Sequence, residues 1–159
     1  MRYVVTGAQM KQIDQDTIQR IGIPPVVLME RAALAVAEEA KNLLSNRRDL
    51  AISGQISWSA AENSGILAVC GMGNNGADGI AAARILKGWG YRVKILLWGN
   101  PEQATQENRL QQKIAEKLQI PMVWEGQKGE ALWKQEMEEG RWPVVIDGIF
   151  GIGLSHPVE

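Results

Sequence analysis

The sequence has only one cysteine and one histidine. The cysteine, Cys70, lies inside an apolar run, and a single cysteine excludes an internal disulfide or a cysteine metal cluster within one chain. This usage fits a reducing, cytoplasmic setting. We interpret the histidine, His156, as a solvated loop residue rather than as a catalytic base.

The sequence also lacks an excess of charge and a long apolar run. Its 17 Lys and Arg residues are balanced by 18 Asp and Glu residues, which gives a net charge of -1. Binding to nucleic acid or to an anionic membrane is therefore disfavoured. No run approaches the roughly 20 apolar residues that span a bilayer, and no signal-peptide core follows the first residues, so we expect a soluble protein.

The composition and length predict a single folded domain. Apolar residues make up 45% of the 159 residues, which is enough to build a core, and one domain over residues 1–159 is expected from the length. Residues 1–47 are predicted to form two helices, separated by Gly22. The first begins with a capping box at Thr6 and Gln9. The second carries an apolar stripe formed by Met29, Ala33, Val36, Ala40 and Leu43. Residues 48–65 are predicted to be a loop or an insertion.

From residue 66 to residue 159 the pattern predicts alternating strands and helices. The expected strands are the nearly continuous apolar runs 66–70, 93–98, 120–124 and 143–146, which is how strands buried on both faces look. The expected helices between them span residues 77–87, 101–119 and 130–138. Alternation at this pitch predicts an α/β fold with a parallel sheet covered by helices on both faces. Sheets of this type usually have five or more strands, so we expect that a C-terminal part of the domain is missing from this sequence.

Residues 71–79, the glycine-asparagine segment, are the strongest functional signal. Gly71, Gly73 and Gly76 match G-x-G-x-x-G between a predicted strand and a predicted helix, where free amides bind a phosphate or another anion. A merely structural turn is the alternative interpretation. No acidic residue ends the second strand, where an ordinary nicotinamide site needs one to hold the ribose.

A second candidate begins at Asp147, at the carboxyl end of the last predicted strand. In open α/β sheets ligands bind at that edge, so its loop is expected beside the glycine-asparagine segment if the two strands are neighbours. The carboxylate could bind a hard cation together with amide oxygens, or act as an acid or base. Alternatively, it caps local backbone amides.

At these residues the sequence resembles the NAD(P)HX epimerase family, also described as the YjeF N-terminal domain. The matching stretches are TGAQMKQID, GIPPVVLMERAALAVA, CGMGNNGADGIAAARIL and VVIDGIFGIGLSHPVE. The resemblance implies a three-layer Rossmann-like domain, often a homodimer. It also implies a repair isomerase that interconverts the R and S forms of hydrated NADH and NADPH. A partner dehydratase, sometimes fused downstream on the same chain, then restores the cofactor.

The resemblance also implies roles for particular residues. Asn75 and Asp147 would help to hold a potassium ion, and Asp147 is the candidate acid or base. The residues implied to contact the substrate are Asn74, Asn75, Gly76, Ala77, Asp78, Gly151, Ile152, Gly153, Leu154, Ser155, His156 and Pro157. The family continues with a further strand that carries an aspartate and a serine of the site. We therefore expect the main acid or base to lie beyond Glu159, and a polypeptide ending there to lack full activity.

Two other functions remain open from the sequence. A non-catalytic nucleotide- or protein-binding module could use the same fold, since one fold hosts several functions. An ordinary oxidoreductase half-domain is disfavoured by the missing acid after the second strand.

Overall fold

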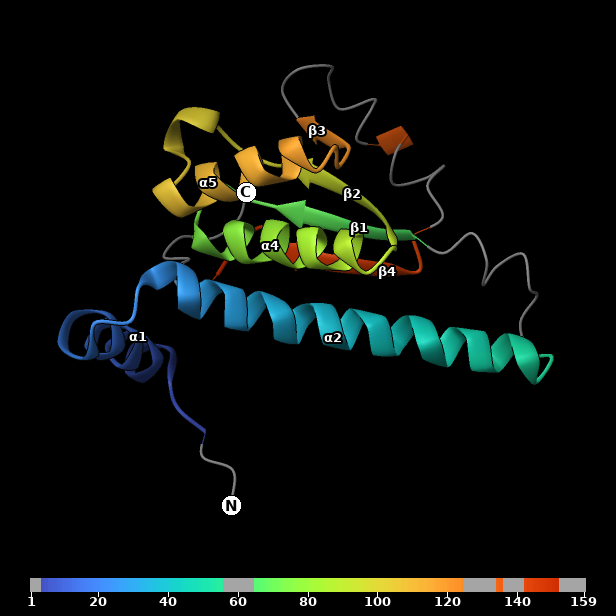
Figure 1. Ribbon diagram of the computed structural model, residues 1–159, viewed down its shortest axis with the longest axis horizontal. Helices are drawn as coiled ribbons and strands as arrows, with labels where there is room; N and C mark the ends of the chain where they lie inside the picture. Colours follow the sequence, from blue (N-terminus) through green and yellow to red (C-terminus); the bar gives the residue numbers. More distant parts are fainter. Residues whose placement is uncertain (1–3, 56–64, 125–133, 136–141, 152–159) are drawn as a thin grey trace.

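A four-stranded parallel sheet with helices packed against it forms the centre of the molecule (Figure 1). The computed structural model describes residues 4–55, 65–124, 134–135 and 142–151. The strands are β1 (Gly65–Cys70), β2 (Arg92–Leu97), β3 (Met122–Trp124) and β4 (Val144–Gly148). The helices are α1 (Gly7–Asp16), α2 (Pro25–Ile52), α4 (Asn74–Gly88) and α5 (Gln106–Lys117), with a π-helical turn η1 (Thr17–Ile21) and a 3-10 turn η2 (Pro101–Gln103).

The strand order is β3-β2-β1-β4, and every pair is parallel. The predicted α/β class and its four strands are therefore confirmed. β1 is buried at every position, as its continuous apolar run predicts. The chain runs outward from β1 to β2 and β3 and then crosses to the other side of β1 to form β4. The strand order thus reverses between β1 and β4, and α/β sheets bind ligands at the carboxyl ends beside such a point.

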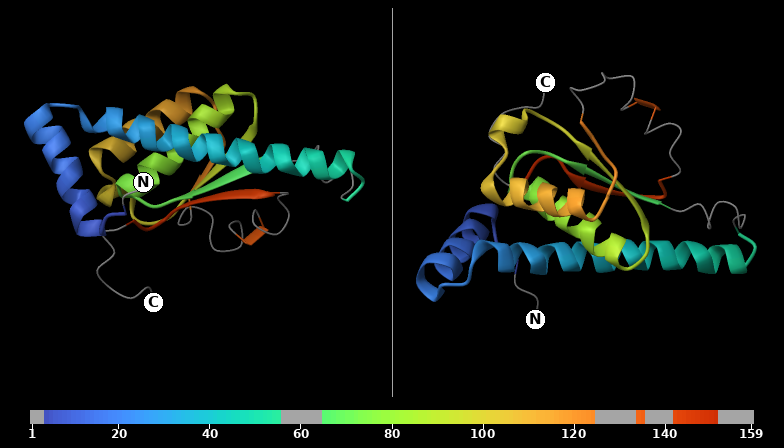
Figure 2. Two further views of the ribbon diagram at one scale, coloured as in Figure 1. Left: turned by 90° about the horizontal axis from the view of Figure 1, so that it is seen from below. Right: turned by 45° about the horizontal axis from the view of Figure 1, so that its top comes forward.

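Helices α2, α4 and α5 lie on one face of the sheet, as Figure 2 shows, so these three helices cover one of the two faces for which helices are predicted. The larger apolar cluster fills the space between these helices and the sheet, and includes Ile66, Ile80 and Ile95. A smaller cluster of Leu67, Val69 and Leu96 lies on the opposite side of the strands. The helix predicted over residues 130–138 falls outside the described residues, except for Lys134 and Gln135, which are helical.

The N-terminal helices begin and break where the sequence predicts. The Thr6 side chain accepts from the Gln9 backbone amide while the Gln9 side chain accepts from the Thr6 amide, which completes the capping box. Gly22 adopts a φ of 87°, a left-handed conformation that glycine reaches without strain. However, α2 continues to Ile52, so the predicted loop start at residue 48 is five residues too early. Polar composition alone does not end a helix when no glycine or proline interrupts it.

The predicted apolar stripe on α2 is partly wrong. Met29, Ala33 and Ala40 are buried, but Val36 is 39% exposed and Leu43 is 47% exposed. Their places in the core are taken by Ala37 and Leu44, one position further along the helix. The reason lies in the partner helix, because α2 packs against α4, which contains the buried alanines 81–83. Small side chains on both helices allow their backbones to approach closely.

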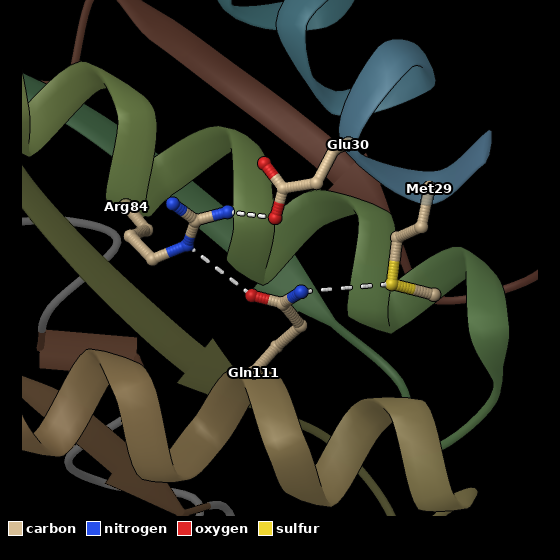
Figure 3. Close-up of polar contacts among 4 residues, drawn as sticks. All are labelled: Met29, Glu30, Arg84 and Gln111. Atoms are coloured by element: carbon tan, nitrogen blue, oxygen red, sulfur yellow. Dashed lines mark hydrogen bonds and ion pairs between the residues drawn. The ribbon is translucent and has the colours of Figure 1, made fainter. Parts of the chain in front are cut away.

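A polar network ties the three helices together (Figure 3). Arg84 of α4 forms an ion pair with Glu30 of α2. It also donates from Nε to Oε1 of Gln111 on α5, at 3.3 Å. Gln111 is fully buried, and its amide nitrogen lies 3.8 Å from the sulfur of Met29. Because buried polar groups are costly unless they are paired, this network fixes the relative positions of the helices.

Candidate functional site

The glycine-asparagine segment turns directly from β1 into α4. The helix begins at Asn74, three residues earlier than the predicted start at residue 77, so Asn74, Asn75 and Gly76 form its first turn. Gly73 is the N-cap and supplies no side-chain hydrogen bond to the helix end. The amides of the first turn thus lack a side-chain cap, and a phosphate or carboxylate of a ligand can accept from them.

The three glycines of the motif differ in what an added Cβ atom would meet. A Cβ on Gly71 would lie 2.3 Å from the carbonyl oxygen of Ile149, and one on Gly76 would lie 1.9 Å from the carbonyl oxygen of Gly71. Both positions therefore admit only glycine. A Cβ on Gly73 would meet nothing within 4 Å. The first and third glycines permit close packing between backbones, whereas the second leaves open space beside the helix N-terminus.

The turns after β1 and β4 lie side by side, as the sequence predicts. The Gly71 amide donates to the carbonyl of Gly148 at 3.1 Å. The side chain of Asn75 donates from Nδ2 to the carbonyl of Phe150 at 2.7 Å, which joins the first turn of α4 to the chain beyond β4. A Cβ on Gly151 would lie 3.1 Å from the Cβ of Asn75. These contacts bring both candidate segments to the point where the strand order reverses.

Asp147 lies in the penultimate position of β4 and is exposed. Its Oδ1 accepts from the amide of Ile149 at 3.0 Å, so the local capping role is present in the structure. The same residue also lines a cavity of about 290 Å³ between α2, α4 and β4, together with Asn75 and Asp78. One carboxylate oxygen thus shapes the turn, and the residue is also placed to act on a ligand.

The cavity beside β4 offers oxygen ligands. Because the nitrogen of the Asn75 amide is engaged with Phe150, its Oδ1 is left to accept or to coordinate. The carboxylate of Asp147 lines the same cavity, and both groups are hard oxygen donors of the kind that suits an alkali or alkaline-earth cation. Among the described residues no group of three His, Cys, Asp or Glu side chains could hold a metal ion. With two oxygen donors, Asn75 and Asp147, the described residues suit a hard cation such as potassium, whose remaining ligands would be water or substrate oxygens.

A larger cavity of about 1100 Å³ also borders the start of α4. Its walls are residues 71–75, Trp98 and Gly99 after β2, the segment 149–151 after β4, and α1. The contribution of α1, which includes Lys11 and Asp14, was not predicted from the sequence. Figure 1 shows α1 beyond the ends toward which the strand arrows point. Asp78 borders both cavities.

The structure brings several of the sequence-predicted site residues together. Asn74, Asn75, Asp78 and Gly151 line the larger cavity, whereas Gly76 and Ala77 are buried beneath the helix start. The remaining predicted contacts, Ile152, Gly153, Leu154, Ser155, His156 and Pro157, lie outside the described residues.

Asp78 has an altered acidity. Burial, together with the smaller effect of the negative charge of Asp14, raises the pKa of this half-buried carboxyl from 3.8 to about 6. Between these two pH values the folded chain therefore holds a proton that the unfolded chain has released. Stability consequently decreases as the pH rises through this window, and the loss is complete above about pH 6.

This difference predicts that Asp78→Asn is more stable than the parent protein at neutral pH. The neutral amide avoids the cost of ionising the carboxyl, which amounts to about 1 to 2 kcal/mol after allowance for partial exposure. Thermal unfolding from pH 3.5 to pH 8 checks this, with buffer values chosen around the pKa of about 6. The melting temperatures of Asp78→Asn and of the parent protein should coincide at the acidic end of the range and separate as the pH rises. An equal separation at every pH would contradict the assignment.

Cys70 takes no part in nucleophilic chemistry at this site. The thiol is buried, and burial raises its pKa strongly, with a further contribution from the charge of Asp147. A thiol that stays protonated is a poor nucleophile. Its sulfur packs against Gly79, where a Cβ would lie only 2.8 Å away.

The fold and the site define an α/β protein with a ligand crevice at the reversal point of a parallel sheet. The sequence matches the family described as YjeF-related protein N-terminus over residues 25–159. The chain belongs to this family.

The curated relatives share a common name. The chain is 41% identical over 155 residues to a protein named NAD(P)H-hydrate epimerase from Limosilactobacillus fermentum, covering 98% of the chain and 62% of the relative. It is 35% identical over 158 residues to one of the same name from Lentilactobacillus buchneri, covering 99% of the chain and 62% of the relative. The chain therefore spans about three fifths of the length of these relatives.

A solved structure supports the fold. The yeast protein ynu0, YNL200c, superposes with a TM-score of 0.76 at 23% identity, covering 99% of this chain and 60% of the yeast chain. Within the described parts of the sequence, no helix has the length and apolarity required to cross a bilayer.

Proposed function

We propose that this chain forms the substrate-binding region of an NAD(P)HX epimerase, which interconverts the R and S forms of hydrated NADH and NADPH. The observation that carries the proposal is the meeting of Asn75 and Asp147 at one cavity, directly beside an uncapped helix N-terminus. The larger adjoining cavity has the size of a site for a nucleotide-like ligand. The shared name of the bacterial relatives supports the same activity.

The residues of the site suit the chemistry of epimerisation. Carbon 6 of the hydrated nicotinamide bears a hydroxyl and the ring nitrogen, so inversion requires proton transfer to and from oxygen. When a carboxylic acid protonates the hydroxyl, water leaves and the ring nitrogen stabilises the resulting iminium. Water then adds to the opposite face and returns a proton to the carboxylate. Asp147 is our candidate for a carboxyl that assists this proton transfer beside the main acid or base expected beyond Glu159, and Asp78, with a pKa of about 6, is the second carboxyl at the cavities.

The proposal also covers the cation and the substrate phosphates. Asn75 and Asp147 would hold a potassium ion, which would supply positive charge beside the bound dinucleotide. The amides at the start of α4 would donate hydrogen bonds to the phosphates, and the segment Gly151, Ile152, Gly153, Leu154, Ser155, His156 and Pro157 would complete their binding. We further propose a homodimer in the cytoplasm, with an NAD(P)HX dehydratase as the partner that consumes the product.

A titration of NADPHX in potassium chloride and in choline chloride at equal ionic strength tests the proposal. We expect tighter binding in potassium chloride, because the ion completes the site. Chromatographic separation of the two epimers in the same samples reports whether these 159 residues are enough for conversion. Failure to bind NADPHX in either salt would refute the proposal.

The competing function is a non-catalytic binding module on the same fold. Such a module would bind a nucleotide or a protein without a requirement for potassium. Equal affinity for NADPHX in the two salts, together with no conversion between the epimers, would favour it. The placement of Asn75 beside Asp147 favours the enzyme, since a docking surface needs no oxygen donor set.

Lys11 should contribute to binding of the substrate phosphates. It lines the larger cavity from α1, opposite the uncapped start of α4. We expect Lys11→Ala to weaken NADPHX binding by about threefold to tenfold at low salt, and by less at high salt, because a partly exposed charge is screened. Lys117→Ala is the matched control, since it removes the same charge from the exposed end of α5. Equal weakening by both variants would show only an effect of net charge.

A further inference from the structure

Asn108, which was not singled out in the sequence, contacts the glycine-asparagine segment directly. It lies in the first turn of α5, and its side chain is fully buried. Its Nδ2 donates to the carbonyl of Gly71 at 2.9 Å and to the carbonyl of Gly73 at 2.9 Å. Its Oδ1 accepts from the side chain of Gln112, one turn further along α5. Both amide hydrogens and the oxygen of Asn108 are thus engaged.

A backbone contact strengthens this attachment. The amide of Thr105, the N-cap of α5, donates to the carbonyl of Met72 at 3.0 Å. Three successive carbonyls, those of Gly71, Met72 and Gly73, therefore accept from the start of α5. Two of these three carbonyls are held by the single side chain of Asn108.

Because the peptide bond is planar, the held carbonyls determine the direction in which the following amides point. In a trans peptide unit the carbonyl and the following amide point in opposite directions. Carbonyls held against α5 therefore direct the amides of Met72, Gly73 and Asn74 away from α5. These three residues line the larger cavity, and successive amides that point the same way form an anion-binding concavity.

We propose that Asn108 is a positioning residue for phosphate binding. By holding the carbonyls of Gly71 and Gly73 it fixes the peptide planes whose amides receive a ligand phosphate. The side chain does not line either cavity. The identity of the ligand rests on the proposed function, whereas the orientation of the peptide planes does not.

Asn108→Leu tests this, with Gln111→Leu as the matched control. Both changes replace a fully buried amide on α5 by a hydrocarbon of similar size, but Gln111 contacts Arg84 and Met29 rather than residues 71–73. The first measurement is amide hydrogen exchange in the ligand-free chain. In the parent structure the amides of Gly71 and Ala77 donate to Gly148 and Gly73, and the amide of Ile95 donates to Pro121 in the sheet.

We expect Asn108→Leu to accelerate exchange at Gly71 and Ala77 about tenfold relative to Ile95, since two hydrogen bonds to the segment are lost. Gln111→Leu should change all three amides in the same proportion, as a general loss of stability does. The second measurement is the dissociation constant of NADPH, used as the probe. It should rise about tenfold in Asn108→Leu and less than twofold in Gln111→Leu.

The outcomes separate this inference from the proposed function. Proportional acceleration at all three amides in Asn108→Leu would overturn the positioning role, whatever the chain binds. If the parent chain binds neither NADPH nor NADPHX, the proposed function fails while the exchange result still decides the role of Asn108. Gln112→Ala provides a milder variant if Asn108→Leu does not fold, because it removes only the group that orients the Asn108 amide. It should show the same segment-specific pattern, at about threefold.

Discussion

Replacement of Gly76 by alanine is expected to abolish dinucleotide binding and to lower the free energy of unfolding by about 3 kcal/mol or more. The new Cβ would lie 1.9 Å from the carbonyl oxygen of Gly71 and 2.7 Å from its carbonyl carbon. Both are backbone atoms between β1 and α4, so no side-chain rotation relieves the overlap. Either the turn or the whole helix must shift, and the amides at the helix start shift with it. Urea unfolding and NADPHX titration measure the two effects.

Gly73→Ala is the matched control within the same motif. Its Cβ would meet no atom within 4 Å, and its φ of -82° suits any residue. Its stability should therefore stay within about 1 kcal/mol of the parent protein, the usual difference between glycine and alanine at an N-cap. Equal destabilisation by the two substitutions would show that the contact with Gly71 is not what requires glycine at position 76.

The second large effect is expected at Asp147, where charge and turn geometry can be separated. Asp147→Asn keeps an oxygen that accepts from the Ile149 amide but removes the negative charge. Its stability should lie within about 0.5 kcal/mol of the parent. The potassium dependence of NADPHX binding should fall by at least about tenfold, because even residues that only support metal ligands contribute that much to affinity.

Asp147→Ala completes this comparison. It removes both the charge and the hydrogen bond to Ile149, so it should lose the potassium effect and, in addition, about 1 kcal/mol of stability. The measurements are thermal unfolding and titrations in potassium chloride and choline chloride. If Asp147→Asn retained the full response to potassium, the carboxylate would serve the turn alone, and the cation site would have to be sought elsewhere.

The parts of the fold that depend on local patterns were predictable. The strands follow from continuous apolar runs, and their parallel arrangement follows from the helices between them. The capping box at Thr6 and the left-handed Gly22 are also local signals. The sequence predicted adjacent turns after β1 and β4 only on the condition that these two strands are neighbours. The structure meets this condition, because β1 pairs with β4 in parallel.

The features that could not be predicted depend on contacts between distant segments. Val36 and Leu43 satisfy a helical apolar period, but the alanines of α4 determine which side of α2 faces inward. Asn108 lies in a helix rich in polar residues, where an asparagine ordinarily faces solvent. It is buried because carbonyls from residues 71 and 73 face it. Likewise, α1 reaches the larger cavity because of the path of the chain through η1 and α2 rather than because of its own sequence.

The hydrogen bond from Asn75 to Phe150 has a consequence for how two ligands would influence each other. It ties the first turn of α4 to the chain after β4, so a cation held at Asn75 and Asp147 would restrict the same atoms that the proposed dinucleotide ligand must find in place. Linkage then requires that the factor by which potassium tightens the dinucleotide equals the factor by which the dinucleotide tightens potassium. At a low concentration of dinucleotide the chain would release its potassium ion, and the occupancies of the two binding sites would rise and fall together.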